Sequence, residues 1–565
     1  MRVLGINAIY HDPSAALVVD GEVVAAAEEE RFSRRKHGKR PVPFSAWELP
    51  ELSARWCLKQ AGLRPQDLDA VAYSFDPALS KPAEELGLDD PWDHLRTTYA
   101  ERAPQFLASA LPGLDPGQVR YVPHHVAHAA SAALAAPHGP SSSVLVLDGR
   151  GERASHLAGR YRDGRLEVLY AQELPHSLGL VYESLTEHLG FLRSSDEFKV
   201  MALASYGTPR YLEELRETIR STGDGGFLAE APDWSRWAPR READASLTEE
   251  SWRGPHADLA CSVQARLEEV LVELAQWIHA QTGDRVLTMA GGTALNCVAN
   301  SRIWRETPFE EVWVQPAAGD AGTSLGAALQ VSADGGEVAA PMPGAALGRG
   351  WSDDELAAWL RGANVPFTTP DDLAEQVADV LADNGVVAWF DGRSEFGPRA
   401  LGQRSLIAHP GHQENLERLN VVKGREQFRP VAPMVLAERA AEIFSDGPIP
   451  SDYMLFVHTV APAWRDRIPA AVHVDGTARI QTVHADRQPR LGAMIRAFER
   501  RTGLPVVINT SLNTAGRPMV DDPRDALELF GSAPVDVLVV GPHLVRRAPL
   551  FGGGSRGRHV AGEAG

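Results

Sequence analysis

The chain has 565 residues, which is too long for a single hydrophobic core and predicts two or more domains. Its net charge of −19 lacks the basic footprint of a nucleic-acid binder, and its 44% hydrophobic content is that of an ordinary soluble protein. No apolar run approaches membrane-spanning length, the N-terminus begins as a strand rather than a signal peptide, and the three cysteines form no CxxC or zinc spacing. We therefore expect a cytoplasmic protein with free thiols that binds neither nucleic acid nor membrane; the sequence leaves a homodimer open.

The first third of the chain contains the same strand, polar loop and hairpin twice. The first copy has a strand at 2–6 and a hairpin at 15–27, and the second has a strand at 144–148 and a hairpin at 155–170. Each hairpin turns at an Asp-Gly pair between apolar runs, which is a strong hairpin signal. The duplication predicts an α/β protein whose N-terminal domain is two-lobed and actin-like (ASKHA), with loops that can present backbone N–H groups to phosphate.

An alanine-rich helix is expected to begin at His124 and to stop before Pro137. His124 and His128 are four positions apart, so both imidazoles project from one face of this helix. Asp148 ends the buried strand that follows, and Asp320 comes after a later strand and before a helix of small residues. Two imidazoles and two carboxylates in these positions suit a divalent metal such as iron, zinc or manganese. The alternative is a helix that carries histidines without a metal.

Glycines also follow predicted strands in this half of the chain. Gly149 comes directly after the second-copy strand, and Gly291 and Gly292 separate a strand at 285–289 from the helix that begins near Asn296. Glycines between a strand and a helix let a ligand approach the backbone closely. We therefore expect these four residues to contact a bound nucleotide.

The stretch 333–350 is rich in Gly, Ala and Pro, and it predicts a linker between domains 1–340 and 351–565. Apolar runs predict strands in the second domain at 385–390, 506–508 and 537–540. Residues 552–565 lack an apolar pattern, and we expect them to be frayed.

The second domain concentrates cationic and amide side chains near glycine and proline. Guanidinium groups bind phosphate and carboxylate through two parallel hydrogen bonds, so this composition predicts an anion pocket in an otherwise acidic protein. The alternative is a solvated charged face with ordinary ion pairs. The residues expected in the pocket are Arg399, Arg404, Lys423, Arg425, Arg429, Arg479, Asn509, Ser511, Asn513 and Arg517.

Several motifs are spread over nearly the whole chain. They are Asn7 with His11-Asp12, Glu28-Glu29-Glu30-Arg31-Phe32, Lys36-His37-Gly38, His124-His125 with His128, Asp148-Gly149, Lys199 with Met201 and Tyr206-Gly207, Gly291-Gly292 with Asn296, and Gly397-Pro398-Arg399-Ala400-Leu401-Gly402. Together these motifs resemble those of the O-carbamoyltransferases of natural-product and nodulation-factor pathways. The resemblance implies an actin-like N-terminal domain similar to the metal-dependent tRNA threonylcarbamoyl transferase, and a C-terminal α/β domain (YrdC-like) similar to the enzyme that makes threonylcarbamoyl adenylate.

The resemblance also implies a reaction. ATP with Mg²⁺ and carbamoyl phosphate would form carbamoyl adenylate in the C-terminal domain, and the carbamoyl group would then pass to a hydroxyl of a small-molecule acceptor such as a sugar or an antibiotic. The implied iron ligands are His124, His128, Asp148 and Asp320; the implied transfer residues are His11 and Lys36; and the implied adenylating residues are Lys423, Arg425, Ser511 and Asn513.

Three alternatives belong to other functional classes. Gly322, Ser324 and Gly326 satisfy the Gly-x-Ser-x-Gly pattern of a hydrolase nucleophile elbow, although the serine lies well beyond the preceding strand. An actin-like sugar kinase or nucleotide-dependent chaperone would share the duplicated hairpins but needs neither the histidine pair nor an arginine-rich second domain. A tRNA-modifying transferase would share both domains, and the net acidity of the chain argues against it.

Overall fold

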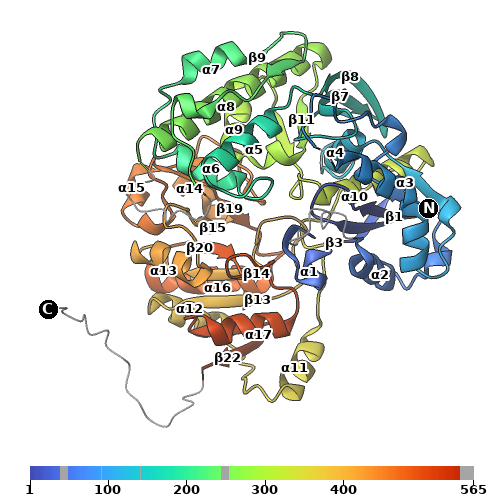
Figure 1. Cartoon of the computed structure of the whole chain (residues 1–565). Helices are drawn as coiled ribbons and strands as arrows, with labels where there is room; N and C mark the ends of the chain where they lie inside the picture. The colour runs from blue at the N-terminus through green and yellow to red at the C-terminus, as the bar shows by residue number, and fades with distance from the viewer. Residues whose placement is uncertain (39–48, 91, 140, 243–252, 548–565) are drawn as a thin grey trace.

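The computed structural model describes residues 1–38, 49–90, 92–139, 141–242 and 253–547. Figure 1 shows two lobes in the N-terminal half, one blue and one mainly green, and an orange-to-red C-terminal half packed against both. The predicted frayed tail, 552–565, lies outside the described residues.

The first lobe is built on a five-stranded sheet of order β3-β2-β1-β4-β5. Strand β1 pairs antiparallel with β2 and parallel with β4, and β2 and β3 form the predicted hairpin. The strands are β1 (Arg2–Asn7), β2 (Ser14–Val19), β3 (Glu22–Glu28), β4 (Ala70–Tyr73) and β5 (Val119–Tyr121).

The second lobe repeats this topology, with the order β12-β11-β6-β7-β8. Read from β8 to β12, the strands of this sheet correspond in order to β3, β2, β1, β4 and β5 of the first sheet. Strand β6, like β1, pairs antiparallel with the first strand of the following hairpin, here β7 and β8, and parallel with a later strand, here β11. This repeat confirms the predicted duplication and the two-lobed, actin-like fold. The strands are β6 (Ser141–Leu147), β7 (Ala154–Arg162), β8 (Arg165–Glu173), β11 (Val286–Ala290) and β12 (Glu311–Val314).

Two helices of small residues, α4 (His124–Ala133) and α10 (Ala321–Asp334), pack together between the lobes. A Cβ atom on Gly326 would lie 1.8 Å from the carbonyl oxygen of Ala127, so the helices approach this closely only because glycine occupies that position. Helix α4 ends three residues before the expected stop, because the chain turns over Leu134–Ala136 ahead of the proline. The close packing fixes the histidine-bearing helix against the helix that begins after Asp320.

The hydrolase alternative is wrong because Ser324 lies inside α10 rather than in a turn after a strand. Its side chain is fully buried, and its hydroxyl donates to the carbonyl of Ala321 at 3.0 Å and accepts from the Ser14 hydroxyl at 2.9 Å. A nucleophile elbow requires an exposed serine between a strand and a helix. Ser324 instead joins α10 to the first lobe.

Further helices and two short strands complete the N-terminal half. The long helix α8 begins at a proline, and it packs against α6, α7 and α9. The bounds are α1 (Glu30–Ser33), a 3₁₀ turn η1 (Lys36–Gly38), α2 (Glu51–Gln60), α3 (Asp93–Ala110), α5 (Leu178–His188), α6 (Glu197–Ala204), α7 (Leu212–Thr218), β9 (Ile219–Ser221), β10 (Phe227–Ala229), α8 (Pro255–Thr282) and α9 (Cys297–Glu306).

The connection between the halves begins later than predicted, because α10 continues to Asp334 and occupies the first two residues of the expected linker. The segment after it follows the first lobe, where the N–H of Ala340 donates to the carbonyl of Gly21 at 2.9 Å and the N–H of Ala26 donates to that of Leu347 at 3.1 Å. The linker is therefore packed along one lobe rather than extended between two separate bodies.

The C-terminal half contains a mixed seven-stranded sheet of order β19-β15-β20-β14-β13-β21-β22 and a small sheet of order β16-β17-β18. The seven strands are β13 (Val387–Phe390), β14 (Arg404–Ala408), β15 (Ala432–Leu436), β19 (Gln481–Val483), β20 (Val506–Ser511), β21 (Val537–Val540) and β22 (His543–Arg546). The short strands are β16 (Phe444–Ser445), β17 (His458–Val460) and β18 (Thr477–Ala478).

Helices pack on this larger sheet around one hydrophobic core. The predicted strands are all present, although β20 runs three residues further than expected, to Ser511. The helices are α11 (Asp353–Gly362), α12 (Leu373–Ala382), α13 (Glu414–Lys423), α14 (Ala440–Ile443), α15 (Pro462–Arg465), α16 (Pro489–Thr502) and α17 (Pro523–Ser532).

All three cysteines are free, as predicted. Over the described ranges, no helix combines the length and the apolar character that a membrane crossing needs.

Candidate metal centre and cation-lined cavity

One cavity of about 1370 Å³ lies between the two halves and takes its lining from both. The predicted residues that line it from the N-terminal half are His11, Lys36, Asp148, Gly149, Gly292, Asn296 and Asp320. Those from the C-terminal half are Arg399, Lys423, Arg425, Arg429, Arg479, Asn509, Ser511, Asn513 and Arg517. The two predicted sites are thus two ends of one space.

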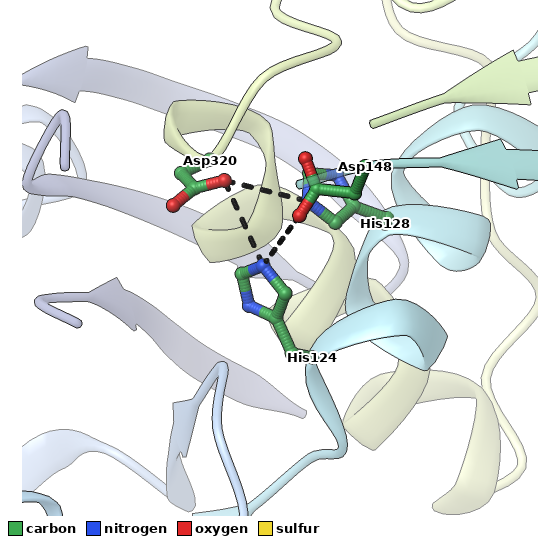
Figure 2. Close-up of side chains that lie close together, drawn as sticks. All are labelled: His124, His128, Asp148 and Asp320. Carbon is green, nitrogen blue, oxygen red and sulfur yellow. Dashed lines mark ion pairs between the residues drawn. The ribbon is translucent and has the colours of Figure 1, made fainter. Parts of the chain in front are cut away.

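The four predicted metal ligands converge at the N-terminal end. Figure 2 shows the imidazoles of His124 and His128 and the carboxylates of Asp148 and Asp320 pointing toward a common point. Nε2 of His124 lies 3.5 Å from an Asp148 oxygen and 3.6 Å from an Asp320 oxygen; Nε2 of His128 lies 3.8 Å and 3.6 Å from oxygens of the same aspartates. All four side chains are buried. This arrangement matches a closed set of two nitrogen and two oxygen ligands.

The donor atoms of this quartet fit a metal ion. Nδ1 of His124 lies 3.1 Å from the carbonyl oxygen of Ser74, which can only accept, so Nδ1 carries the proton and Nε2 keeps a lone pair. Within the part of the chain that the structure describes, Nε2 of His124, Nε2 of His128 and both Asp320 carboxylate oxygens are buried without a hydrogen-bond partner. Buried polar atoms normally have partners, so this set of unpartnered atoms could hold a cation.

Charge at this end is set by the proximity of the four groups. Burial alone would raise the pKa of Asp148, but the adjacent side chains of His124 and His128 lower it below its usual range. Burial would likewise raise the pKa of Asp320, but the nearby charge of His11 and the adjacent side chains of His124 and His128 lower it. Both carboxylates are therefore anionic, which is the form that binds a metal.

Neighbouring backbone and side chains hold the ligands in place. The carboxylate of Glu152 accepts the N–H of His124 at 2.8 Å and the N–H of Asp76 at 2.8 Å, which anchors the first turn of α4. The N–H of Gly292 donates to the carboxylate of Asp148 at 2.9 Å, so this glycine orients one of the four side chains of the quartet. Glu152 was not predicted, because a glutamate five residues after the end of β6 carries no sequence signal for this contact.

His11 lies beside the metal centre, with its Nε2 3.7 Å from an Asp320 oxygen. Its Nδ1 is 2.9 Å from one oxygen of Asp12, and the other Asp12 oxygen is 2.6 Å from Nδ1 of His37. Burial opposes the ionisation of Asp12, but the charge and hydrogen bonds of the two histidines lower its pKa well below the usual range. The Asp12 carboxylate thus fixes the orientation of His11 and leaves Nε2 directed at the centre. The sequence motif contained Asp12 without indicating this role.

The other end of the cavity carries an excess of positive charge. Nζ of Lys423 lies 2.6 Å from the Ser511 carbonyl, 3.0 Å from its hydroxyl and 2.5 Å from the Asn513 amide oxygen. Burial and the charges of Arg425, Arg429 and Lys36 lower the pKa of Lys423. Lys36 therefore lies near enough to act on this end of the cavity, although it was expected only in the transfer site.

Several guanidinium groups surround Lys423. Nε of Arg425 donates to the Asn420 amide at 2.6 Å, which fixes the side chain at the end of α13. Burial and the neighbouring charge of Arg479 lower the pKa of Arg399 to about 9, so these two cations repel one another. The Nε atoms of Arg399 and Arg479 are buried and unpartnered among the described residues, so these cations could receive a polyanion.

Two predicted binding residues have other roles. Arg404 lies outside the cavity, fully buried against the ring of Phe390, and its guanidinium donates to backbone carbonyls including those of Asp391 at 2.9 Å and Arg349 at 3.1 Å. Gly291 also lies outside it, and a Cβ there would lie 2.2 Å from the Leu147 carbonyl, so the glycine serves strand packing. Neither residue lines the cavity in which ligand contact was predicted, and a sequence does not show which way a side chain or a glycine faces.

Two predicted amides line the cavity but are largely occupied by protein partners. The Asn296 amide exchanges hydrogen bonds with Gln264 and caps α9 by accepting from the N–H of Ala299 at 3.1 Å. The Asn509 amide nitrogen donates to Gln481 at 3.0 Å and to the Ala400 carbonyl at 3.0 Å. Both shape the cavity wall.

Comparison with known proteins assigns the class. The protein-family model described as "Carbamoyltransferase N-terminus" matches residues 2–114 and 111–329 of the sequence. The family model described as "Carbamoyltransferase C-terminus" matches residues 378–547. The chain therefore belongs to the carbamoyltransferase family. Members of this class transfer a carbamoyl group. This assignment takes the place of the sugar-kinase and chaperone alternatives.

Similar proteins cover nearly the whole chain. An uncharacterized protein of Synechocystis is 35% identical over 95% of this chain and 95% of its own length. Nodulation protein NolNO of Sinorhizobium fredii is 36% identical over 96% of this chain and 80% of its own length. Nodulation protein U of Rhizobium tropici is 32% identical over 94% and 93%, respectively.

Solved structures overlap only weakly. HypF of T. kodakarensis has a TM-score of 0.33 at 14% identity over 60% of this chain and 49% of that chain. The fold assignment accordingly rests on the sheet topology described above.

Proposed function

We propose that the protein is an ATP-dependent O-carbamoyltransferase that makes carbamoyl adenylate at the cationic end of the cavity and transfers the carbamoyl group to an acceptor hydroxyl at the metal end. The observation that carries this proposal is the single cavity with opposite charge requirements at its two ends. One end gathers cations for phosphate groups, and the other gathers a metal quartet beside an oriented histidine.

In the first half-reaction, carbamoyl phosphate, water and ATP give carbamoyl adenylate, phosphate and pyrophosphate. Carbamoyl phosphate and the ATP triphosphate with its Mg²⁺ are both polyanionic, so Lys423, Arg425 and Arg399 would bind and orient them. The carbamate carbon is a poor electrophile, and its attachment to AMP supplies a good leaving group.

In the second half-reaction, an acceptor hydroxyl attacks the carbamoyl carbon and AMP leaves. His11 would take the hydroxyl proton at Nε2, because Asp12 holds the proton of Nδ1 on the opposite side of the ring. Lys36 would stabilise the negative charge that develops on the reacting oxygens. A divalent metal held by His124, His128, Asp148 and Asp320, with iron as our first expectation, would supply Lewis acidity toward the leaving phosphate.

Mass spectrometry of the product tests this proposal. Purified protein is incubated with ATP, Mg²⁺, carbamoyl phosphate and a panel of hydroxylated sugars and antibiotics. We expect an acceptor whose mass increases by one carbamoyl group only when ATP and carbamoyl phosphate are both present. A carbamoylated product that forms without ATP would contradict the adenylate route, and carbamoylation of tRNA in place of every small molecule would move the acceptor to another class.

A further inference from the structure

The loop that carries Arg425 is held by a helix of the other half of the molecule. Nζ of Lys199, on α6, lies 2.8 Å from a carboxylate oxygen of Glu426 and 3.0 Å from one of Asp196. The side chains of Lys199 and Glu426 are 16% and 21% exposed, so this ion pair is only partly open to solvent. A partly buried pair of this kind is worth more than a surface pair, because water screens it less.

Glu426 connects Lys199 to the cations of the cavity. It follows Arg425 directly in the chain, and its second carboxylate oxygen lies 3.6 Å from the guanidinium of Arg429. That guanidinium also lies over the ring of Phe198, 4.4 Å from its centre, and Phe198 precedes Lys199 on α6. Two consecutive residues of α6 therefore contact the carboxylate and one guanidinium of the same loop.

Apolar packing fixes the loop against the same lobe. Phe428 is 3% exposed and belongs to the hydrophobic core of the second lobe rather than to that of the C-terminal half. Its ring centre is 6.4 Å from that of Phe191 and 6.5 Å from that of Tyr206. The loop is thus attached by a buried ring on one side and by an ion pair on the other.

The neighbouring charges explain why the attachment matters. Burial and the charges of Arg429 and Arg479 lower the pKa of Arg425, while the charge of Glu426 raises it. Glu426 is thus a carboxylate placed among mutually repelling cations. Lys199 occupies one of its oxygens, so Glu426 can pair with Arg429 through the other without moving toward the phosphate space.

We propose that Lys199, a residue of the metal-bearing half, is a positioning residue for the adenylate-forming half-reaction. It holds Glu426, and through it the loop that places Arg425 and Arg429 toward carbamoyl phosphate and ATP. The inference rests on the proposed function, because it assumes that phosphate groups bind these cations. It makes the first half-reaction dependent on a helix that carries none of the residues assigned to that reaction.

Steady-state release of pyrophosphate by the full-length protein tests the inference. Lys199→Met removes the charge and keeps the length of the side chain. We expect KM for carbamoyl phosphate or ATP to rise about tenfold while kcat changes less than about twofold, because neighbouring groups couple by this much without taking part in the chemistry. Lys199→Arg should restore most of the loss. Lys81→Met is the matched control, since Lys81 forms an exposed pair with Glu173 outside the cavity, 3.1 Å apart.

The charge-reversed pair separates positioning from general damage. Lys199→Glu and Glu426→Lys alone should each raise KM, and their combination should bring KM back toward the wild-type value. Wild-type KM in Lys199→Met, or a double variant that is no better than the worse single one, would overturn the inference. If the wild-type protein itself releases no pyrophosphate with carbamoyl phosphate and ATP, the proposed function fails instead.

Discussion

The two ends of the cavity are built in different ways. At the metal end, the four side chains come from the first half of α4, the residue after β6 and the residue before α10, and all four are buried. At the cationic end, Arg399, Arg425 and Arg479 stand outside the regular helices and strands. The metal end is therefore set by the packing of one domain, while the cationic end is assembled from loops that need support from elsewhere.

The contacts between the halves supply that support. Arg31 on α1 donates to the carbonyl of Gly397 at 2.9 Å, and the N–H of Gly397 donates to Glu28 at 2.9 Å. Arg34 donates to the carbonyls of Met519 and Pro518 at 2.8 and 3.0 Å. Together with the contacts of α6, these bonds join the first and second lobes to three separate loops of the C-terminal half. The comparison of the two ends indicates that cationic loops can be held in position by contacts with a neighbouring domain.

The largest effect is expected from removal of a metal ligand. His128→Ala takes away one of four buried ligands, and we expect near-stoichiometric metal in the wild type to be lost together with product, by more than about 100-fold. Elemental analysis measures the metal directly. His125→Ala is the control, because His125 is buried on the same helix but stands outside the quartet. Active wild-type protein without metal would contradict the metal assignment.

A smaller effect should follow from loss of the carboxylate that orients His11. In Asp12→Asn, we expect kcat for transfer to fall about 10- to 100-fold while the KM of the acceptor, metal content and pyrophosphate release stay near wild type. Asp163→Asn is matched in backbone, since φ is 49° at Asp163 and 50° at Asp12, but it lies in an exposed turn. Equal effects of the two substitutions would show that Asp12 only stabilises the local backbone conformation and does not orient His11.

The smallest effect on catalysis is expected at the arginine outside the cavity. Arg404→Met leaves buried carbonyls without donors, so the free energy of unfolding should fall by about 3 kcal/mol while KM in the folded protein stays unchanged. Chemical denaturation measures the first quantity and pyrophosphate release the second. Arg500→Met, whose side chain is 61% exposed, should change stability by less than about 0.5 kcal/mol. A raised KM with little loss of stability would return Arg404 to the anion site.

Local rules were sufficient for much of the fold and for the metal end. The Asp-Gly hairpins, the four-residue spacing of His124 and His128, and the carboxylate after β6 each follow from periodicity or turn chemistry within a few residues. Their convergence follows from the duplication, because repeated sheets bring equivalent loops to one cleft.

The remaining features depend on tertiary contacts that no short pattern contains. Asp12 contacts His37 across 25 residues of sequence, and both residues adopt a positive φ, of 50° and 57°, that the motif does not indicate. Lys199 and Glu426 lie in different halves of the chain, and they meet where Phe428 packs into the second lobe and Arg429 lies over Phe198. Arginines beside glycine and proline looked alike in the sequence, yet Arg404 faces backbone carbonyls and Arg399 faces the cavity.

The most direct test of the account separates the two half-reactions in a single turnover. Arg425→Ala should lose the pyrophosphate release that depends on carbamoyl phosphate, and with it all product. His128→Ala should lose product but keep that release in the first turnover. Synthetic carbamoyl adenylate should then restore product in Arg425→Ala and not in His128→Ala. Rescue of neither variant, or absence of first-turnover pyrophosphate in His128→Ala, would contradict a cavity with adenylation at one end and transfer at the other.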